Sequence, residues 1–139
     1  MIAGFFQFSP ERGRPEQNAA RLEEALRSTK ADLLVCPELA TTGYLYLDRE
    51  ELRAVAEPVP SGPTVTRLAQ AARETKRAIV FGIAERAGEK IYNSAVAIQG
   101  DDRLLGIALP GAAGRCGNER HQRQYVLIEP VHLVPTQIM

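Results

Sequence analysis

Two hydrophobic patterns alternate along the chain. In residues 15–29, Ala19, Leu22 and Leu26 recur three and four residues apart, which is the spacing of an amphipathic helix. Similar stripes, with Pro15 in a first turn and Asp48 as an N-cap, predict three helices, at residues 15–29, 48–56 and 63–76. Compact apolar runs and strictly alternating stretches predict five strands, at residues 2–8, 31–35, 78–84, 91–99 and 104–108.

The order of these elements predicts the fold class. One strand, a helix, a second strand, two helices and three further strands make a layered α/β arrangement, in which helices cover a mixed sheet. Gly100 and the two aspartates after it predict a hairpin turn between the last two strands. After residue 108 glycine and proline cluster, and residues 125–128 are the only candidate strand. We therefore predict a domain at residues 1–108 and a divergent, poorly packed tail at residues 109–139.

Composition narrows the class of protein. The 139 residues are 45% hydrophobic and 24% charged, as in an ordinary soluble domain. Seventeen basic residues balance seventeen acidic ones, so the net charge gives no reason to expect nucleic acid as a partner. No apolar run approaches the roughly 20 residues that span a bilayer, and the first residues lack the basic leader of a signal peptide. With Cys36 and Cys116 as free thiols, a cytoplasmic protein is expected.

The strongest chemical signal follows the strand predicted at residues 31–35. The sequence there reads Leu-Leu-Val-Cys-Pro-Glu and continues through Thr-Thr-Gly to Tyr44. Open α/β sheets place their ligands at the carboxyl ends of strands, which is where this pattern puts Glu38. Glu38 is therefore a candidate catalytic residue, and Tyr44 is a candidate substrate-binding residue.

This motif resembles the glutamate motif of the carbon–nitrogen hydrolases of the nitrilase superfamily. Weaker matches occur on both sides of the motif, in that family's order, and together they extend the resemblance from Met1 to about Gly106. They are Gln7, Asn18, Gly62-Pro63-Thr64 and Ile91-Tyr92-Asn93-Ser94-Ala95. The resemblance implies the layered α-β-β-α sandwich of the nitrilase type, incomplete in this chain.

The resemblance also implies a reaction. In that family a cysteine attacks an amide or nitrile carbon and forms a covalent intermediate, and a lysine stabilises the developing oxyanion. The glutamate transfers the protons, and Glu38 matches it. The implied substrate is a small amide or nitrile, hydrolysed without a metal or an organic cofactor.

Two members of that catalytic set are not found where the resemblance requires them. No lysine follows Lys90, although the family's lysine should come shortly after Gly106. Cys116 comes too early and in a glycine-rich loop, so the nucleophile is not assigned to it. A truncated or frame-shifted gene product is one hypothesis for this pattern. We predict that Glu38 lies in a concave pocket and that the chain alone has no amidase or nitrilase activity.

Alternative interpretations remain open. The chain could be a non-catalytic remnant or interaction module that keeps the α/β scaffold, and a homo-oligomer is compatible with an incomplete sheet. Cys36 is interpreted as a core residue, and Asn93 as satisfying backbone groups in a turn or bulge. Cys116 and His121 are too few for a zinc site.

Overall fold

The computed structural model describes residues 1–100 and the backbone of residues 104–107. The predictions for the tail at residues 109–139, including its boundary, the candidate strand at residues 125–128 and the role of Cys116, lie outside the described residues.

The described chain forms one mixed sheet with helices on it. Five strands lie side by side in sequence order: β1 (Ala3–Phe5), β2 (Leu33–Val35), β3 (Ala78–Ala87), β4 (Lys90–Ile98) and β5 (Leu104–Ile107). The first three run parallel, and the last two pairings are antiparallel. Three helices fill the long connections: α1 (Pro15–Ser28), α2 (Arg49–Val55) and α3 (Pro63–Thr75). The predicted element order and mixed sheet are confirmed.

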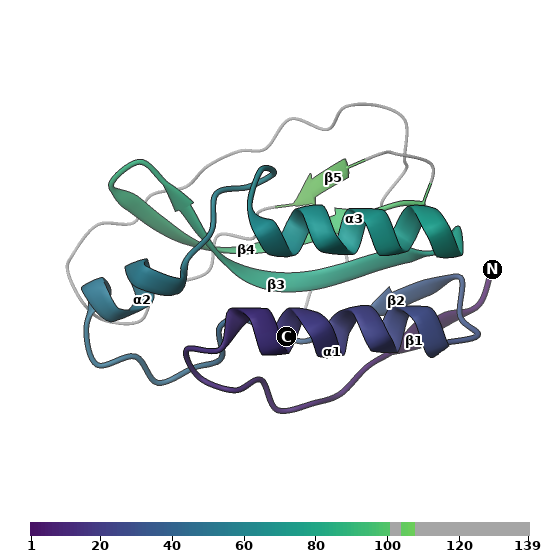
Figure 1. Cartoon of the computed structure of the whole chain (residues 1–139), viewed down its shortest axis with the longest axis horizontal. Coiled ribbons are helices and arrows are strands. Elements are labelled where there is room, and N and C mark those ends of the chain that lie inside the picture. Colours follow the sequence, from purple (N-terminus) through teal and green to yellow (C-terminus); the bar gives the residue numbers. More distant parts are fainter. Residues whose placement is uncertain (101–103, 108–139) are drawn as a thin grey trace, which may run out of the picture.

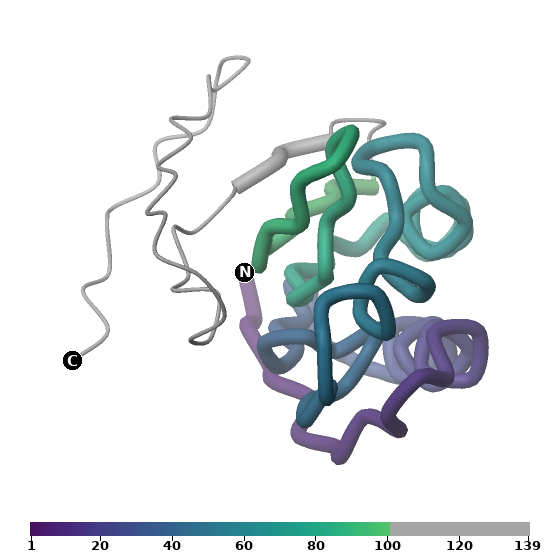
Figure 2. Tube along the Cα trace, turned by 90° about the vertical axis from the view of Figure 1, so that its left-hand side faces the viewer, coloured from purple at the N-terminus to yellow at the C-terminus, as the bar shows by residue number. Residues whose placement is uncertain are grey.

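The helices α1 and α3 cover one face of the sheet. They lie side by side in Figure 1, and Figure 2 shows them nearly end-on, on the same side of the strands. Both crossovers advance the sheet in the same direction between parallel strands, so the right-handed connection brings both helices to one face. The core between them is apolar and almost fully buried, and its largest members are Leu22, Leu26, Val65, Leu68, Ile79, Phe81, Ile83 and Val96.

The helices begin and end for local chemical reasons. Pro15 and Pro63 occupy first turns, where a missing N–H costs nothing. Asp48 caps α2 as predicted, because its side chain accepts a hydrogen bond of 2.8 Å from the N–H of Glu51. The N-cap residue of α3 is Gly62, which has no side chain to act as a cap.

A buried carboxylate replaces the missing side-chain cap of α3. Glu57 accepts hydrogen bonds from the N–H of Thr64 at 2.8 Å and from its hydroxyl at 2.5 Å. Only 7% of Glu57 is exposed, so its negative charge lies inside the protein at the positive end of the helix. This capping interaction was not predicted, because Glu57 precedes the helix by several residues.

Two strands, β1 at the edge of the sheet and β3 at its centre, end at other residues than predicted. β1 ends at Phe5, earlier than expected. The N–H of Phe6 still donates to the carbonyl of Val35 at 2.8 Å, and the rings of Phe6 and Phe8 stack with centroids 4.9 Å apart. β3 continues to Ala87, later than expected, because its last residues pair with the start of β4 across a turn at Gly88. Gly88 has a positive φ of 59°, which glycine adopts without strain.

The opposite face of the sheet carries exposed apolar side chains. Phe5 and Val35 lie across from each other in neighbouring strands and are 79% and 39% exposed. Further along β3 the side chains on this face become small, because the positions are occupied by Gly82 and Ala84. In the part of the chain that the structure describes, no helix is long and apolar enough to cross a membrane.

Candidate active site

Glu38 follows the carboxyl end of β2, in the middle of the parallel part of the sheet. The chain remains bonded to β3 up to the residue before it. The N–H of Cys36 donates to the carbonyl of Val80 at 2.7 Å, and the N–H of Gly82 donates to the carbonyl of Pro37 at 3.0 Å. The predicted location of Glu38 at the end of a central strand is confirmed.

The backbone at Glu38 then crosses directly over β3, which requires Gly82. A Cβ atom on Gly82 would lie 2.4 Å from the nitrogen of Leu39 and 2.6 Å from the Cα of Glu38, far inside van der Waals contact. Leu39 itself has a positive φ of 45°, which is unfavourable for a residue with a side chain. Backbone strain beside Glu38 and the missing side chain of Gly82 together set the path of the loop.

Two donors hold the carboxylate of Glu38. The side-chain amide of Asn93 donates to Oε1. The hydroxyl of Tyr44 lies 3.2 Å from Oε2 and 3.0 Å from the carbonyl oxygen of Glu38. Asn93 reaches the carboxylate because it is paired with Ala84 in the sheet, next along the same face from Gly82.

These contacts bear on two predictions. Glu38 is exposed, so the described residues do not enclose it, and the concave pocket expected around it stays a prediction. Asn93 was expected to satisfy backbone groups, but its amide bonds to the glutamate. The sequence could not reveal this contact, because it depends on the register between β3 and β4.

Tyr44 lies beside the glutamate with 45% of its surface exposed. The pKa of its phenol is raised above the ordinary value, first by partial burial and then by the negative charge of Glu38 and the hydrogen bond to it. Tyr44 therefore keeps its proton at neutral pH and acts as a donor to the carboxylate.

The loop that carries Glu38 and Tyr44 is braced from α1. The buried side chain of Asn18 donates to the carbonyl of Thr41 at 3.0 Å and exchanges two hydrogen bonds of 2.8 Å with the backbone of Glu11. Gly43, with a φ of +74°, lies against the backbone of Arg12, where a Cβ would be 3.1 Å away. Two loops from different parts of the chain thus form one layer beneath the site.

Cys36 lies two residues before Glu38 but does not share its chemistry. Its side chain packs against the core under the helices, and burial raises the pKa of the thiol to about 12. At neutral pH the thiol therefore keeps its proton, whereas the thiolate is the nucleophilic form. The interpretation of Cys36 as a core residue is confirmed.

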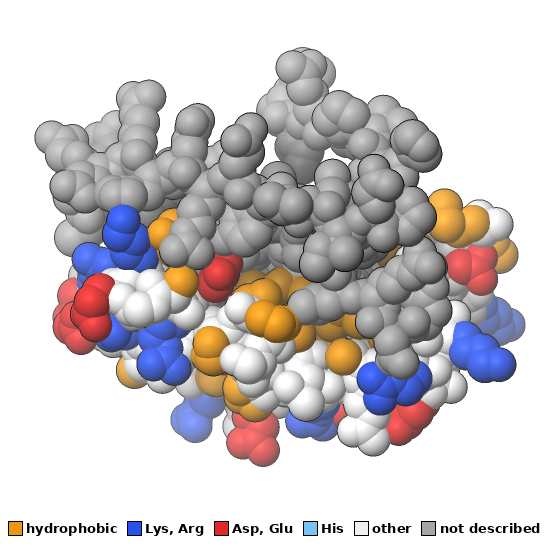
Figure 3. All heavy atoms as spheres, turned by 90° about the horizontal axis from the view of Figure 1, so that it is seen from above, with side chains coloured by type: hydrophobic (Ala, Val, Ile, Leu, Met, Phe, Trp, Pro, Cys, Tyr) orange, Lys and Arg blue, Asp and Glu red, His pale blue; other side chains and the backbone are white. Residues whose placement is uncertain are grey.

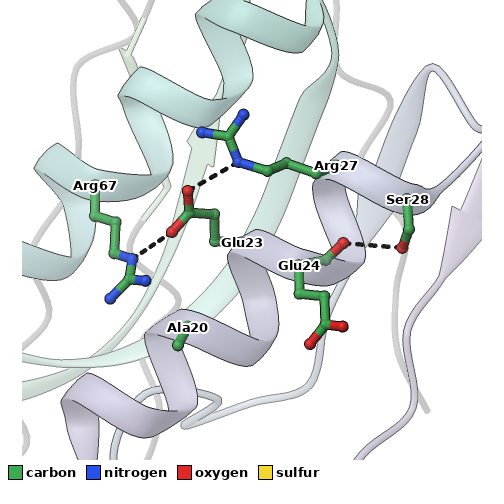
Figure 4. A pocket seen from close by; sticks show the side chains of 6 residues that line it. All are labelled: Ala20, Glu23, Glu24, Arg27, Ser28 and Arg67. Carbon is green, nitrogen blue, oxygen red and sulfur yellow. Dashed lines mark hydrogen bonds and ion pairs between the residues drawn. The ribbon is translucent and has the colours of Figure 1, made fainter.

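A shallow groove lies between α1 and α3, on the helical side of the sheet. Figure 4 shows Glu23 between Arg27 and Arg67, and the carboxylate pairs with both guanidinium groups, at 2.8 Å and 2.5 Å. Arg27 also pairs with Glu74 at 2.7 Å. The ion pairs of Glu23 with Arg67 and of Arg27 with Glu74 connect the two helices. Because the carboxylates already compensate these positive charges, the groove is a poor site for an anion.

The described surface mixes charges of both signs. In Figure 3, blue and red side chains lie close to one another around the edge of the view, and hydrophobic side chains gather towards its middle. Among the residues that the structure describes, no three His, Cys, Asp or Glu side chains come together as a metal site requires. Glu38, Asn93 and Tyr44 therefore remain the candidate site in the described part of the chain.

Comparison with protein families and known sequences connects this geometry to an enzyme class. A family model for carbon–nitrogen hydrolases matches residues 3–128. A nitrilase of Pyrococcus abyssi is 38% identical over 97 residues, which are 68% of this chain and 37% of that protein. A hydrolase from the pqqF 5' region of Pseudomonas protegens is 34% identical over 107 residues, again 37% of its length. The chain thus spans little more than a third of these relatives.

Solved structures agree with the fold. The structure of XC1258, a CN-hydrolase superfamily protein of Xanthomonas campestris, matches 76% of this chain and 39% of its own, with a TM-score of 0.65 and 23% identity. An N-terminal amidase solved with an Asn-Glu peptide has the same TM-score and identity over 76% of this chain and 27% of its own. The predicted nitrilase-type α/β fold is therefore confirmed, with one helical layer on one sheet in the described residues.

Proposed function

The chain belongs to the carbon–nitrogen hydrolase family, and from that premise we propose that Glu38 is the general base of a site that hydrolyses small amides or nitriles. The observation that carries the proposal is the carboxylate at the end of β2, held on both oxygens by Asn93 and Tyr44. Both partners donate, so the two contacts orient the oxygens of Glu38 as hydrogen-bond acceptors.

In this reaction Glu38 would take up and pass on a proton twice. It takes a proton from the attacking thiol and gives it to the leaving nitrogen. It then takes one from the water that cleaves the acyl intermediate and returns it to the departing thiolate. Its exposure fits this role, because the nucleophile, the substrate and the water must all reach the carboxylate. Tyr44, half-exposed beside it, would form one wall for the small amide or nitrile.

A second candidate function is a non-catalytic scaffold. The observation that favours it is the lack of a nucleophile and an oxyanion group in the described part of the chain. Cys36 is held as a buried thiol with a pKa of about 12, and Lys90, the last lysine in the sequence, lies at the far end of the β3–β4 hairpin. We expect the chain by itself to show no turnover, because members of a catalytic set act as a unit.

The first experiment is an assay of the purified full chain against a panel of aliphatic amides, N-terminal Asn or Gln peptides, and nitriles, with ammonia release as the readout. Wild type, Glu38→Gln, Cys116→Ala and the matched surface variant Gln70→Ala are compared. Absence of turnover in all four agrees with the expectation. Turnover that disappears in both Glu38→Gln and Cys116→Ala, but not in Gln70→Ala, would assign the nucleophile to Cys116.

A chimera tests the role of Glu38 itself. Residues 1–106 replace the matching segment of the Pyrococcus abyssi nitrilase, whose remaining sequence is kept. We expect hydrolysis by the chimera and a loss of about 10²-fold or more in kcat for its Glu38→Gln variant, the usual size of an acid–base contribution. An active chimera that does not need Glu38 would refute its role as the base and favour the scaffold interpretation.

A further inference from the structure

We propose that Asn93 is the positioning residue of Glu38, and that it fixes the carboxylate from the rigid sheet so that its second oxygen stays on Tyr44. This inference rests on the proposed function of Glu38 and adds a specific residue and contact to it. Asn93 touches the glutamate and acts through it, without itself taking part in proton transfer.

The two donors come from different parts of the fold. Tyr44 belongs to the same loop as Glu38, only six positions further along the chain, so the two can move together. Asn93 is 55 positions away and lies in β4, which is hydrogen-bonded to β3 along its whole length and to β5 near its end. Asn93 is therefore the contact that ties the carboxylate to the sheet.

The chemistry of the amide suits this task. A side-chain N–H of asparagine can only donate, and it stays neutral over the whole physiological pH range. It therefore accepts no proton from the base and does not compete for the substrate proton. A lysine at the same position would add a charge, and a serine could turn its hydroxyl to accept instead. Asn93 orients an ionised carboxylate without altering its net charge.

Exposure of Glu38 explains why such a contact is needed. An exposed glutamate samples several rotamers about its three side-chain bonds, and ordering them costs conformational entropy. Glu38 is exposed among the residues that the structure describes, so packing within them does not confine its side chain. Bonds to Asn93 and Tyr44 select one arrangement in advance, and a base needs such a fixed arrangement when a proton is transferred.

A purely structural role does not account for Asn93. Its backbone pairs with Ala84 in the ladder whatever side chain it carries, and the side chain itself is only half-buried. The hydrogen bond described for its amide goes to Glu38. Truncation of Asn93 should therefore leave the sheet in place and release the carboxylate.

Titration of Tyr44 reports the contact without any substrate. Its pKa is raised by partial burial, by the charge of Glu38 and by the hydrogen bond to it. When Glu38 moves away, the last two contributions weaken and the pKa of Tyr44 falls. The full chain labelled with ¹³Cζ-tyrosine gives one signal per tyrosine, and Tyr44→Phe assigns the relevant one.

We expect the pKa of Tyr44 to fall in Glu38→Gln and, by most of the same amount, in Asn93→Ala. Asn93→Gln keeps the donor and should recover part of the shift. Gln70→Ala is the matched control, because it deletes an amide that donates to a carboxylate, Glu74, at 2.9 Å on the surface of α3. It should leave Tyr44 unchanged. Circular dichroism of each variant shows that it is folded.

The outcomes separate the proposals. A lowered pKa in Glu38→Gln with a wild-type value in Asn93→Ala would overturn the positioning role. A wild-type value in both variants would overturn the contact between Glu38 and Tyr44 on which that role depends. If Asn93→Ala does not fold, the value in Asn93→Gln relative to Asn93→Leu, which keeps a similar volume and loses the donor without adding a charge, decides in the same way. None of these results depends on turnover, so failure of the proposed hydrolase function remains distinguishable.

Discussion

The two faces of β3 are built on opposite principles. On the face under α1 and α3, Ile79, Phe81 and Ile83 alternate as large apolar side chains, each fully buried. On the other face, Gly82 and Ala84 leave only a shallow surface, and the loop of Glu38 lies directly on it. One face of β3 thus packs large apolar side chains against the helices. The other face, which we call the platform, supports the backbone of the Glu38 loop at Gly82.

This difference determines what each face tolerates. The helical face depends on buried area and close packing, so apolar residues of similar volume can replace one another at modest cost. The platform depends on the absence of atoms, since even one methyl group at Gly82 meets the backbone of Leu39. Stability is therefore concentrated on the first face, and the position of the candidate base is set on the second.

The largest effect on stability is expected from Phe81→Ala. This change removes a fully buried ring from beneath both helices and should cost about 3–5 kcal/mol in the free energy of unfolding, including the cavity left behind. Urea denaturation followed by circular dichroism measures the loss. Phe81→Leu, the control, should lose much less, and equal losses would show that this face does not depend on packed volume.

Cys36, which follows β2 and packs against the core, gives the free energy of unfolding a pH dependence. Its pKa is raised to about 12 from an ordinary value of 9.0, by burial. The folded state disfavours the thiolate, so ionisation of Cys36 opposes folding. Its contribution to the free energy of unfolding is therefore complete below pH 9 and is lost as the pH rises towards 12. The total loss is up to about 4 kcal/mol. Denaturation midpoints of wild type and Cys36→Ala between pH 8 and 11 test this. A constant difference between them would contradict the burial of the thiol.

Gly82→Ala should be milder in stability and more damaging to the site. The added methyl group cannot fit without moving the loop of Glu38, at a cost of about 1–3 kcal/mol. The ¹³C signal of Tyr44 should also change, because its partner moves. Ala84→Gly on the same face is the control, since it removes atoms and leaves the crossing loop alone. A normal Tyr44 signal in Gly82→Ala would break the link between the platform and the site.

The smallest effect is expected on the outer surface, at Arg67→Ala. Arg67 pairs with Glu23 across the groove between α1 and α3, but its side chain is 40% exposed and solvent screens the pair. A loss below about 1 kcal/mol is expected, and it should shrink further in high salt. Thermal melts at low and high ionic strength measure it. A larger, salt-independent loss would mean that the helices depend on charge as much as on their apolar contact.

Local signals in the sequence identified most elements of the fold. Asp48 was identified as an N-cap from its place before a helical pattern, and the structure has the predicted hydrogen bond to the N–H of Glu51. Each such feature depends on neighbours a few positions away. The capping of α3 by Glu57 was missed, because that carboxylate precedes its helix and arrives through a turn. The limits of β1 and β3 were also missed, since pairing partners decide where a strand ends.

The sequence by itself determined the order of helices and strands, the packing of Cys36 against the core and the position of Glu38 after a central strand. Periodicity and local chemistry encode these features within short windows of the chain. Only the tertiary structure decided that Asn93 holds Glu38, that Gly82 makes room for it, and that the carboxylate stays exposed. The reason is register: a slip of one residue between β3 and β4 would turn Asn93 to the helical face, and the residue of β3 that lies opposite Asn93 is decided only when the two strands pair.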